Sequence, residues 1–514
     1  MSADNAIARR QPFRVTAPIF STVEAYLTIK EVALTRTSTL RRLIFSGPLL
    51  AVFLFPGGSA ALPAQEQADC VGCHEKKTPG IVAQWRSSKH GELEIDCLYC
   101  HGAESSDLDA FEHQGATVAV IVSPKDCAEC HQDEFDQQKG SHHAKAGQIL
   151  GSLDNLLGEL VGGQPAVNAG CRQCHGSEVR VDDSGRPTAD TWPNTGMGRI
   201  NPDGSRGSCS ACHTRHEFSK AQARQPEGCG KCHLGPDHPQ IEVWNESKHG
   251  VLYHANREKL NLDSDPWRAG QEYFSGPTCA SCHMSAAGDQ ESTHDVGARI
   301  SWTLRPPVSV KLNMLVFEDH SKQDITGDEP QLPEAGAMLD DGQGGQKKVT
   351  RVLTWKDRRS NMQQVCTMCH AGSFVAGAYD QFDQVVLLYN DKFARPAASI
   401  IDELHKAGRI TAVDFDDPIE WTWWELWHHE GRRARHGASM QGPDYTWWHG
   451  MYEVAKHFYE KFIPQVIEVA GEEQAKLLLE KYVYSQPGHL WHRDGYSDEV
   501  REKIRQFYQE RYKQ

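Results

Sequence analysis

Sixteen cysteines dominate the chemistry available to this 514-residue chain. They form eight pairs with two residues between the members of each pair, and a histidine directly follows every pair. C-x-x-C-H is the attachment motif of c-type haem, because two thiols at this spacing reach the two vinyl groups of one porphyrin and the histidine lies under the iron. A zinc knuckle or a redox C-x-x-C pair is the alternative, but neither requires a histidine at the same place every time. We therefore predict eight covalently bound haems c.

The eight motifs use every cysteine, so none remains for a disulfide bond. The cysteines predicted to bind haem are Cys70, Cys73, Cys97, Cys100, Cys127, Cys130, Cys171, Cys174, Cys209, Cys212, Cys229, Cys232, Cys279, Cys282, Cys366 and Cys369. The predicted proximal iron ligands are His74, His101, His131, His175, His213, His233, His283 and His370.

The chain has 26 histidines, many more than the motifs use. Low-spin haems take a second axial ligand, which is often histidine. The phrase W-x-x-S-K-H-G occurs twice and contains His90 and His249, so we predict these two as distal ligands. His294 is a further predicted ligand, drawn from the weaker candidates outside this phrase. Each weaker candidate could equally be a surface or hydrogen-bonded histidine; these are His113, His142 or His143, His216 and His254.

The helices and loops that position these motifs must be short where the motifs lie close together in the sequence. Residues 65–300 hold seven motifs, which leaves room only for short helices and loops. Residues 299–317 alternate and are rich in β-branched types, which predicts one or two strands. Residues 321–348 are rich in Gly, Asp and Gln, which indicates an exposed insertion. After about Phe382 there are no cysteines, and long helical patterns cover 447–462, 466–484 and 497–512.

We therefore predict a mainly α fold with little β structure. A multihaem cytochrome c domain with stacked haems is expected over 65–385, and a helical C-terminal domain over 386–514. Aromatic side chains in the second region are explained most simply by helix packing, although some could pack against haems. An unusual group surrounds four histidines there: Trp421, Trp423, Trp424, Trp427, Trp447 and Trp448, with His428, His429, His436 and His449.

The charge and the N-terminal segment indicate a compartment and a class of partner. A formal charge of −15 argues against nucleic acid as a partner and suits a small basic cytochrome, although solubility alone would also explain it. Arg41 and Arg42 precede a short apolar run over 43–55, and small residues follow up to Ala64. This pattern predicts a signal peptide region over 1–64, cleaved between Ala60 and Ala64, and a periplasmic or equivalent location. No later stretch is long and apolar enough to predict a membrane span in the mature chain.

Three local phrases add a resemblance to the eight motifs. The fourth motif lies in Asn168–Gly176, Asp237-His238 follows the sixth motif, and Gly442–Gly450 contains Tyr445. Together with the eight motifs and a cysteine-free helical C-terminal region, these phrases mark a resemblance between the chain and the octahaem hydroxylamine oxidoreductase family. The resemblance covers roughly residues 65–480.

The resemblance implies a catalytic fourth haem, held by Cys171, Cys174 and His175, with an open face where the substrate nitrogen binds ferric iron. It implies that Asp237 and His238 stand over that face and accept substrate protons. The alternative is a simple turn in which His238 ligates another haem.

In oxidising members of the family a tyrosine crosslinks to the catalytic haem of a neighbouring subunit. Tyr445 matches that tyrosine, Tyr452 is its rival, and either could be an ordinary core residue. The resemblance also implies a homotrimer.

The resemblance implies the oxidation of hydroxylamine to nitric oxide or nitrite, with electrons passing through seven bis-histidine haems to an external c-type cytochrome. A hydrazine dehydrogenase would share every motif. A reductive nitrite or hydroxylamine enzyme would lack the crosslinking tyrosine. A pure electron-transfer protein would ligate all eight irons on both sides and would need no Asp-His pair.

Overall fold

The computed structural model describes residues 69–151, 157–326, 332–340 and 345–512. The predicted signal region lies outside these residues. The described part belongs to a compact unit that begins at Gln65. It is mainly helical, which confirms the predicted fold class. None of its helices is long and apolar enough to cross a membrane.

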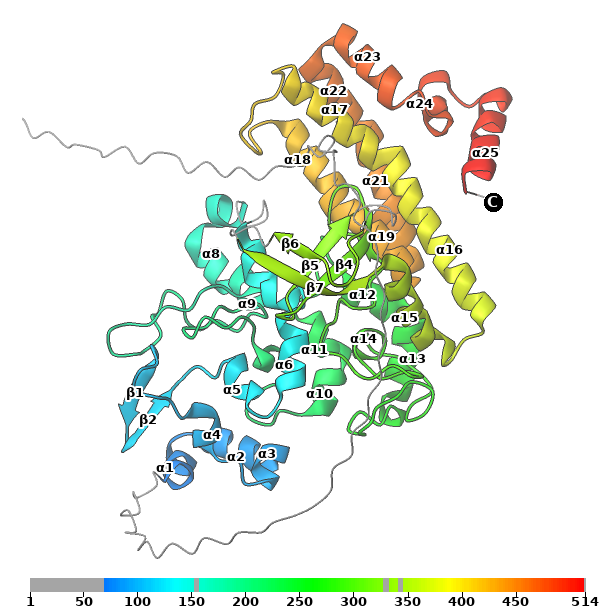
Figure 1. Cartoon of the computed structure of the whole chain (residues 1–514). Helices are drawn as coiled ribbons and strands as arrows, with labels where there is room; N and C mark the ends of the chain where they lie inside the picture. The colour runs from blue at the N-terminus through cyan, green and yellow to red at the C-terminus, as the bar shows by residue number, and fades with distance from the viewer. Residues whose placement is uncertain (1–68, 152–156, 327–331, 341–344, 513–514) are drawn as a thin grey trace, which may run out of the picture. The chain divides into compact units, whose positions relative to one another are not determined.

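Short helices carry the first seven motifs, as predicted from their crowding (Figure 1). The N-terminal elements are α1 (Cys70–Lys77), α2 (Pro79–Ser87), α3 (Lys89–Glu92), α4 (Cys97–His101), β1 (Ala110–His113), β2 (Ala116–Ala119), α5 (Pro124–Ala128), α6 (Gln132–Lys139), η1 (His143–Gly151), η2 (Gly158–Gly162), α8 (Gly163–Ala169) and α9 (Cys171–His175). The next are η3 (Cys209–Ala211), α10 (Lys220–Arg224), α11 (Pro226–Gly230), α12 (Gln240–Glu246), α13 (Lys248–Asn256), η4 (Arg257–Lys259) and α14 (Cys279–His283).

Several motifs begin at the first residue of a helix, so one helical turn presents both cysteines on the same face. Polar N-caps fix these starts. The Asp69 carboxylate accepts a hydrogen bond from the Gly72 amide at 2.8 Å, and the Asp96 carboxylate accepts one from the Leu98 amide at 2.9 Å. Thr278 caps α14 through a capping box with Ser281.

A five-stranded antiparallel sheet separates the seventh motif from the eighth. Its strands are β3 (Trp302–Thr303), β4 (Val310–Phe317), β5 (Lys322–Thr326), β6 (Met338–Asp340) and β7 (Gln346–Leu353), in the order β3-β4-β7-β6 with β5 also paired to β4. The strands predicted over 299–317 are confirmed. The described residues of the insertion predicted over 321–348 are exposed or half-buried, in agreement with the prediction, but the insertion also contains β5 and β6, which pair with β4 and β7.

The C-terminal region is a helical bundle with its own apolar core. Its elements are α15 (Trp355–Thr367), α16 (Gly372–Tyr389), η6 (Asn390–Ala394), α17 (Arg395–Lys406), α18 (Pro418–Trp424), η7 (Glu425–Glu430), α19 (Gly431–Met440), α20 (Pro443–Thr446), η8 (Trp447–Tyr452), α21 (Glu453–His457), η9 (Phe458–Phe462), α22 (Ile463–Ala470), α23 (Glu472–Tyr482), η10 (Pro487–His489), α24 (Leu490–Asp494) and α25 (Asp498–Tyr512). Phe458, Phe462 and Ile400 are fully buried in this core. The domain boundary expected at residue 385 stays a prediction, and α16 runs through that position.

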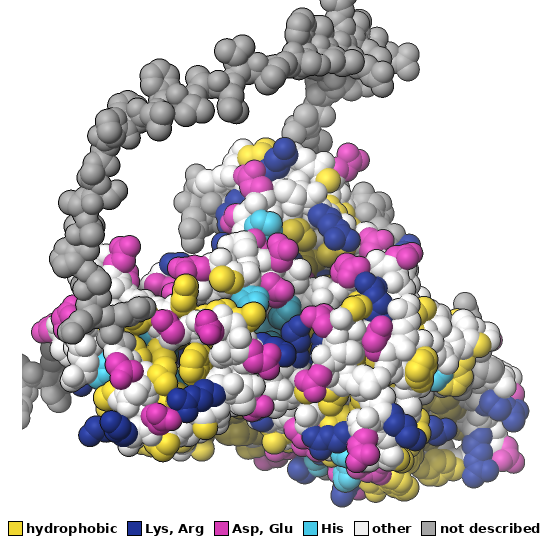
Figure 2. Space-filling model, turned by 90° about the horizontal axis from the view of Figure 1, so that it is seen from below, with side chains coloured by type: hydrophobic (Ala, Val, Ile, Leu, Met, Phe, Trp, Pro, Cys, Tyr) yellow, Lys and Arg dark blue, Asp and Glu magenta, His cyan; other side chains and the backbone are white. Residues whose placement is uncertain are grey.

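The surface carries many carboxylates. Figure 2 shows acidic side chains spread over one face of the molecule, with hydrophobic and histidine side chains visible in hollows between them.

Candidate haem centres and active site

Six motif histidines each face a second histidine. The ring centres within each pair are 6.0 to 6.4 Å apart. The pairs are His74 with His113, His131 with His90, His101 with His216, His233 with His143, His213 with His294, and His370 with His249.

This separation fits one iron between two imidazoles. A metal–imidazole bond is about 2 Å long and the nitrogen lies about 1 Å from the ring centre, so two axial imidazoles have centres roughly 6 Å apart. Burial, the main cause, lowers the pKa of His143 to about 4 and that of His233 to about 3, so both rings are neutral and able to bind metal. The described residues therefore fit haem at these six motifs. The structure places all three predicted distal ligands, His90, His249 and His294, in such pairs.

Backbone carbonyls orient several motif histidines. The Nδ1 atom of His101 lies 2.9 Å from the Ala119 carbonyl oxygen, and that of His283 lies 3.1 Å from the Val296 carbonyl oxygen. Donation from Nδ1 fixes the ring and leaves Nε2 for a metal, as is usual for metal-bound histidine.

The structure divides the weaker candidates for distal ligands into two groups. His113, His143 and His216 face motif histidines. His254 instead hydrogen bonds to Asn245 at 3.1 Å. The Nε2 atom of His142 lies 3.4 Å from the Asp324 carboxylate.

The motif thiols trace a connected network. Thiols of three pairs of motifs lie close enough to shift each other's pKa: Cys127 with Cys209, Cys174 with Cys232, and Cys229 with Cys279. Other thiols lie within electrostatic range of each other, linking the first motif to the second, the second to the third, the fifth to the sixth and the seventh to the eighth. The fourth motif therefore joins this network through the sixth.

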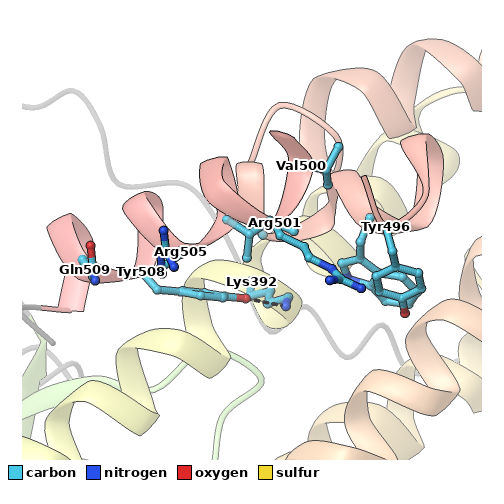
Figure 3. A pocket seen from close by; sticks show the side chains of 10 residues that line it. Lys392, Tyr496, Val500, Arg501, Arg505, Tyr508 and Gln509 are labelled. Carbon is cyan, nitrogen blue, oxygen red and sulfur yellow. Dashed lines mark hydrogen bonds between the residues drawn. The ribbon is translucent and has the colours of Figure 1, made fainter. Parts of the chain in front are cut away.

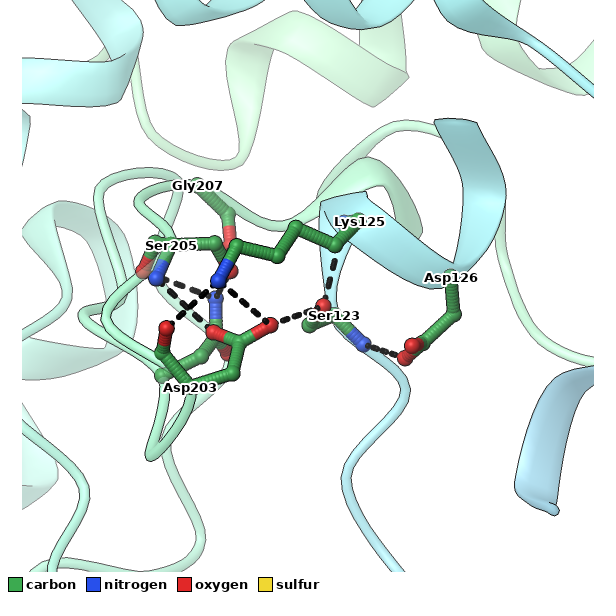
Figure 4. Close-up of polar contacts among 7 residues, drawn as sticks. Ser123, Lys125, Asp126, Asp203, Ser205 and Gly207 are labelled. Atoms are coloured by element: carbon green, nitrogen blue, oxygen red, sulfur yellow. Dashed lines mark hydrogen bonds and ion pairs between the residues drawn. The ribbon is translucent and has the colours of Figure 1, made fainter. Parts of the chain in front are cut away.

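A polar clamp holds the third and fifth motifs together (Figure 4). The Ser123 hydroxyl, at the N-terminus of α5, donates to the Asp203 carboxylate at 2.7 Å, and the Lys125 ammonium donates to the Asp203 carbonyl at 2.6 Å. The loop of Asp203 continues through Gly207 to Cys209. This clamp fixes Cys127 against Cys209.

Asp237 and His238 form an ion pair beside the fourth and sixth motifs. They lie in the loop before α12, and the His238 Nδ1 atom is 2.5 Å from an Asp237 carboxylate oxygen. His238 also lies within electrostatic range of the Cys174 thiol. The chain thus places a carboxylate and an imidazole at the fourth motif, although those residues lie more than 60 positions apart in the sequence.

Electrostatics keeps Asp237 ionised and raises the proton affinity of His238. Burial alone would raise the pKa of Asp237, but the hydrogen bond and charge of His238, with the charges of His428 and Arg432, outweigh it and lower that pKa to about 2. Burial alone would lower the pKa of His238, but the hydrogen bond and charge of Asp237 outweigh it and raise that pKa. The arrangement suits a group that accepts protons.

The C-terminal bundle completes the site. The Arg432 guanidinium lies 3.4 Å from the Asp237 carboxylate, and the His428 Nε2 atom lies 3.9 Å from it. His428 belongs to the π-helical segment η7 and stacks on Trp424 at 4.0 Å. The histidines among these tryptophans are evident in the sequence, but nothing in the sequence connects them with Asp237.

His238 also borders the sixth motif. Its ring centre is 6.2 Å from that of His233, which already faces His143. The ion pair with Asp237 sets His238 apart, because none of the six paired distal histidines has a carboxylate ion pair within the described residues. The alternative that His238 ligates a haem is tested by substitution below.

Tyr445 lies away from this ion pair within the chain. It is half-buried on α20, and its ring contacts His449 at 5.4 Å. Tyr452 is 44% exposed and packs on Trp448. Trp447 and Trp448 are also more than half exposed. The structure therefore gathers both candidate tyrosines on one aromatic face of the bundle.

A cavity of about 750 Å³ lies elsewhere, between η6, α24 and α25 (Figure 3). Lys392 lines it and donates to the Tyr508 hydroxyl at 2.7 Å, with Arg501 and Arg505 nearby. No motif cysteine or histidine lines the cavity. It is not a candidate for the redox site.

Comparison with known proteins agrees with the motifs. A family model described as seven times multi-haem cytochrome CxxCH matches residues 195–325, a range that holds three of the eight motifs. The chain is 27% identical over 351 residues to a probable nitrite reductase-hydroxylamine oxidoreductase fusion protein of Kuenenia stuttgartiensis, covering 61% of this chain and 35% of that protein. It is 28% identical over 217 residues to a high-molecular-weight cytochrome c of Nitratidesulfovibrio vulgaris, covering 40% of this chain and 36% of that protein. The chain thus spans about a third of the length of these curated relatives.

Solved structures share the fold. A hypothetical multiheme protein aligns with a TM-score of 0.63 at 26% identity, over 78% of this chain and 95% of that one. A chain of the Kuenenia stuttgartiensis reducing HAO-like protein complex Kustc0457/Kustc0458 aligns with a TM-score of 0.54 at 20% identity, over 78% of this chain and 84% of that one. With the paired histidines and the C-x-x-C-H motifs, these findings show that the chain is similar to multihaem c-type cytochromes, among them the probable nitrite reductase-hydroxylamine oxidoreductase fusion protein.

Proposed function

We propose that the chain oxidises hydroxylamine to nitric oxide or nitrite at its fourth motif. The observation that carries this proposal is the Asp237–His238 ion pair, placed beside Cys174 and supported by Arg432 and His428. Oxidation of hydroxylamine removes protons together with electrons, so the site needs a proton acceptor next to the reacting nitrogen. A pure electron-transfer protein has no such need.

The chain's own residues handle the protons. When bound, the haems would supply redox-active iron at the substrate and a route for electrons to an external c-type cytochrome. Asp237 stays ionised because Arg432 and His428 stabilise its charge. That carboxylate orients His238 and stabilises its protonated form, so His238 accepts a proton and passes it on. The pair is half-buried, with side-chain exposures of 20% for Asp237 and 33% for His238, so only part of its surface is open to water.

We extend the proposal to assembly and compartment. Eight haems, a homotrimer, a crosslink from Tyr445 to the fourth haem of a neighbouring subunit, and a periplasmic or equivalent location all follow from the motifs and the resemblance. The aromatic face that carries Tyr445 supports an intersubunit role, because exposed tryptophans on a bundle surface are typical of protein–protein contacts.

A reductive activity is the second candidate. The name of the fusion protein from Kuenenia stuttgartiensis includes a nitrite reductase, and the Asp237–His238 pair could equally donate protons. Hydrazine oxidation would use the same residues.

Steady-state assays with the haem-loaded protein test the proposal. Hydroxylamine and hydrazine are supplied with an artificial electron acceptor, and nitrite and hydroxylamine are supplied with a reduced dye. We expect the fastest turnover for hydroxylamine oxidation, with nitric oxide or nitrite as product. Faster hydrazine oxidation would reassign the substrate. Turnover only with the reduced dye would show that the enzyme works as a reductase. No turnover in any assay would leave electron transfer as the one remaining function.

A further inference from the structure

Arg358 is a fully buried cation, and the described residues provide hydrogen-bond acceptors for only some of its donor atoms. It lies in the second turn of α15, and its side chain is 0% exposed. The Nη2 atom donates to the Gly297 carbonyl at 2.5 Å. The Nε and Nη1 atoms are buried without a hydrogen-bond partner among the described residues.

Such an arrangement is costly unless an anion completes it. Burying a charged group with unmet donors destabilises the folded chain, since the group loses its water and gains no partner. Two carboxylates stand nearby, but both have other partners. Asp295 is paired with Lys322, and Asp324 lies 3.4 Å from His142. Neither forms a hydrogen bond with Arg358 in the described part of the chain.

The guanidinium lies next to the seventh motif. Gly297, which accepts its hydrogen bond, follows Val296, whose carbonyl oxygen orients the seventh-motif histidine, His283. Helix α15 also packs against α14, the helix that consists of that motif. The two unmet donors are therefore close to the place of the haem attached at Cys279 and Cys282. Each haem carries two propionate groups, and a propionate is a carboxylate, the preferred partner of a guanidinium.

We propose that Arg358 binds a propionate of the haem attached at Cys279 and Cys282. The inference rests on haem attachment and not on the substrate, so it stands or falls independently of the proposed function. It assigns Arg358 a positioning role: it holds this propionate ionised and fixes the haem between α14 and α15.

Two other arginines show what is unusual about Arg358. Arg359, its neighbour in sequence, pairs with the Asp383 carboxylate through two bonds of 2.6 and 2.7 Å. Arg435 is equally buried, but its Nε, Nη1 and Nη2 atoms all donate to oxygens of its own chain. Neither needs a cofactor to satisfy it. Arg435 therefore provides a matched control for the removal of a buried arginine.

The first test is an experimental structure of the haem-loaded protein. We expect a propionate oxygen of the seventh haem within hydrogen-bond distance of Arg358 Nε or Nη1. A chloride ion, a water molecule or a propionate of another haem at that place would overturn the assignment.

The second test is a redox titration at several pH values of Arg358→Gln, Arg358→Lys and Arg435→Gln. Without Arg358 the propionate loses its cation and its protonation becomes coupled to reduction. We expect Arg358→Gln to shift one midpoint potential to a lower value and make it pH-dependent near neutrality, at unchanged haem content. Arg358→Lys should keep the midpoint potential close to the wild-type value, because it retains the positive charge. Arg435→Gln should leave all midpoint potentials unchanged. An unchanged set of potentials in Arg358→Gln would refute the proposal. If Arg358→Gln does not fold, the experimental structure of the haem-loaded wild type decides, because it shows directly whether a propionate lies at Arg358 Nε or Nη1.

Discussion

His249 and His254 lie five residues apart on α13, yet their surroundings differ. The ring of His249 faces the motif residue His370 at 6.0 Å, whereas His254 hydrogen bonds to Asn245 near the surface. The repeated phrase around His90 and His249 therefore marks the histidines that face another imidazole. A residue's place in such a phrase is more informative than its type alone.

Substitution of these two histidines tests the axial pairing. We expect His249→Ala to convert one low-spin haem to a five-coordinate high-spin haem, because its iron loses the distal nitrogen. His254→Ala should leave the spectrum unchanged. Electron paramagnetic resonance and absorption spectra of the haem-loaded variants measure this. High-spin signal in His254→Ala, or none in His249→Ala, would contradict the pairing.

The Asp237–His238 pair gives a second prediction at this scale. Asp237→Asn and His238→Ala should each lower hydroxylamine turnover by roughly a hundredfold or more, the usual scale for the loss of a general base. Steady-state rates and the haem content of each variant are measured together. Asp402→Asn, which removes an exposed carboxylate paired with Lys406, should leave turnover unchanged.

The same variants decide the role of His238. If it is a proton acceptor, His238→Ala keeps all low-spin haems. Appearance of a new high-spin haem would make His238 an axial ligand of the sixth motif's haem. Full activity in both variants would place proton handling elsewhere.

The π-helical segments are the distinctive elements of the C-terminal bundle. Segments η6, η7, η8 and η9 interrupt its α-helices. The wider turn of η7 places His428 toward Asp237, and Arg432 follows on α19. Such bulges occur often at functional sites. The bundle thus provides two neighbours of Asp237 as well as an apolar core.

Acid stability of this bundle depends on His489. Its ring is fully buried, the Tyr459 hydroxyl lies 2.7 Å from Nδ1, and the Lys392 carbonyl oxygen lies 2.9 Å from Nε2. Because Nε2 must donate to the carbonyl, Nδ1 accepts from Tyr459, so the ring is neutral. Burial, helped by the charge of Lys392, lowers the pKa of His489 to about 3.

The sign of the pH effect follows from that pKa. Below about pH 6.5 the unfolded chain binds a proton at this histidine and the folded chain does not, so the free energy of unfolding decreases by about 1.4 kcal/mol per pH unit until the folded pKa near 3 is reached. We expect His489→Gln, which cannot titrate, to lose less stability than the wild type between pH 6.5 and 4. Thermal unfolding followed by circular dichroism measures this, and parallel pH profiles for the two proteins would contradict it.

At the scale of the whole molecule, the motif network has one branch. The fourth motif branches off at the sixth. The other seven motifs form one path from the first motif to the eighth. A site at the end of a branch can exchange electrons with the rest at a single junction. This arrangement suits a substrate site that feeds an electron-transfer chain.

The crosslink prediction belongs to the assembly. If Tyr445 bonds to the fourth haem of a neighbour, denaturing electrophoresis without reductant should show a band near three times the subunit mass. Tyr445→Phe should give single-chain bands, lose any absorption that ordinary c-type haems lack, and shift activity toward reduction, because the porphyrin is no longer distorted. Tyr452→Phe is the matched control on the same face. Transfer of these effects to Tyr452→Phe would identify Tyr452 as the crosslinking residue, and a single-chain band for the wild type would favour the reductive function.

The sequence by itself determined the haem chemistry, because C-x-x-C-H is a local pattern. Two thiols three positions apart and the adjacent histidine need only one helical turn to meet one porphyrin. Motif density and the absence of cysteine after 369 likewise predicted short helices followed by a helical bundle. The sheet was predicted only in part, since β5 and β6 depend on pairing with β4 and β7 and have little local pattern of their own.

Only the tertiary structure decided which distant residues meet. His74 faces His113 and His213 faces His294 because loops of quite different lengths bring them to one iron-sized gap, and no spacing rule predicts that. Arg432 reaches Asp237 across 195 positions, through the packing of α19 against α12. Arg358 shows the same limit, because its sequence neighbours do not reveal that two of its donors are buried without a partner. Local spacing specifies what binds a haem, whereas long-range packing specifies which groups surround it.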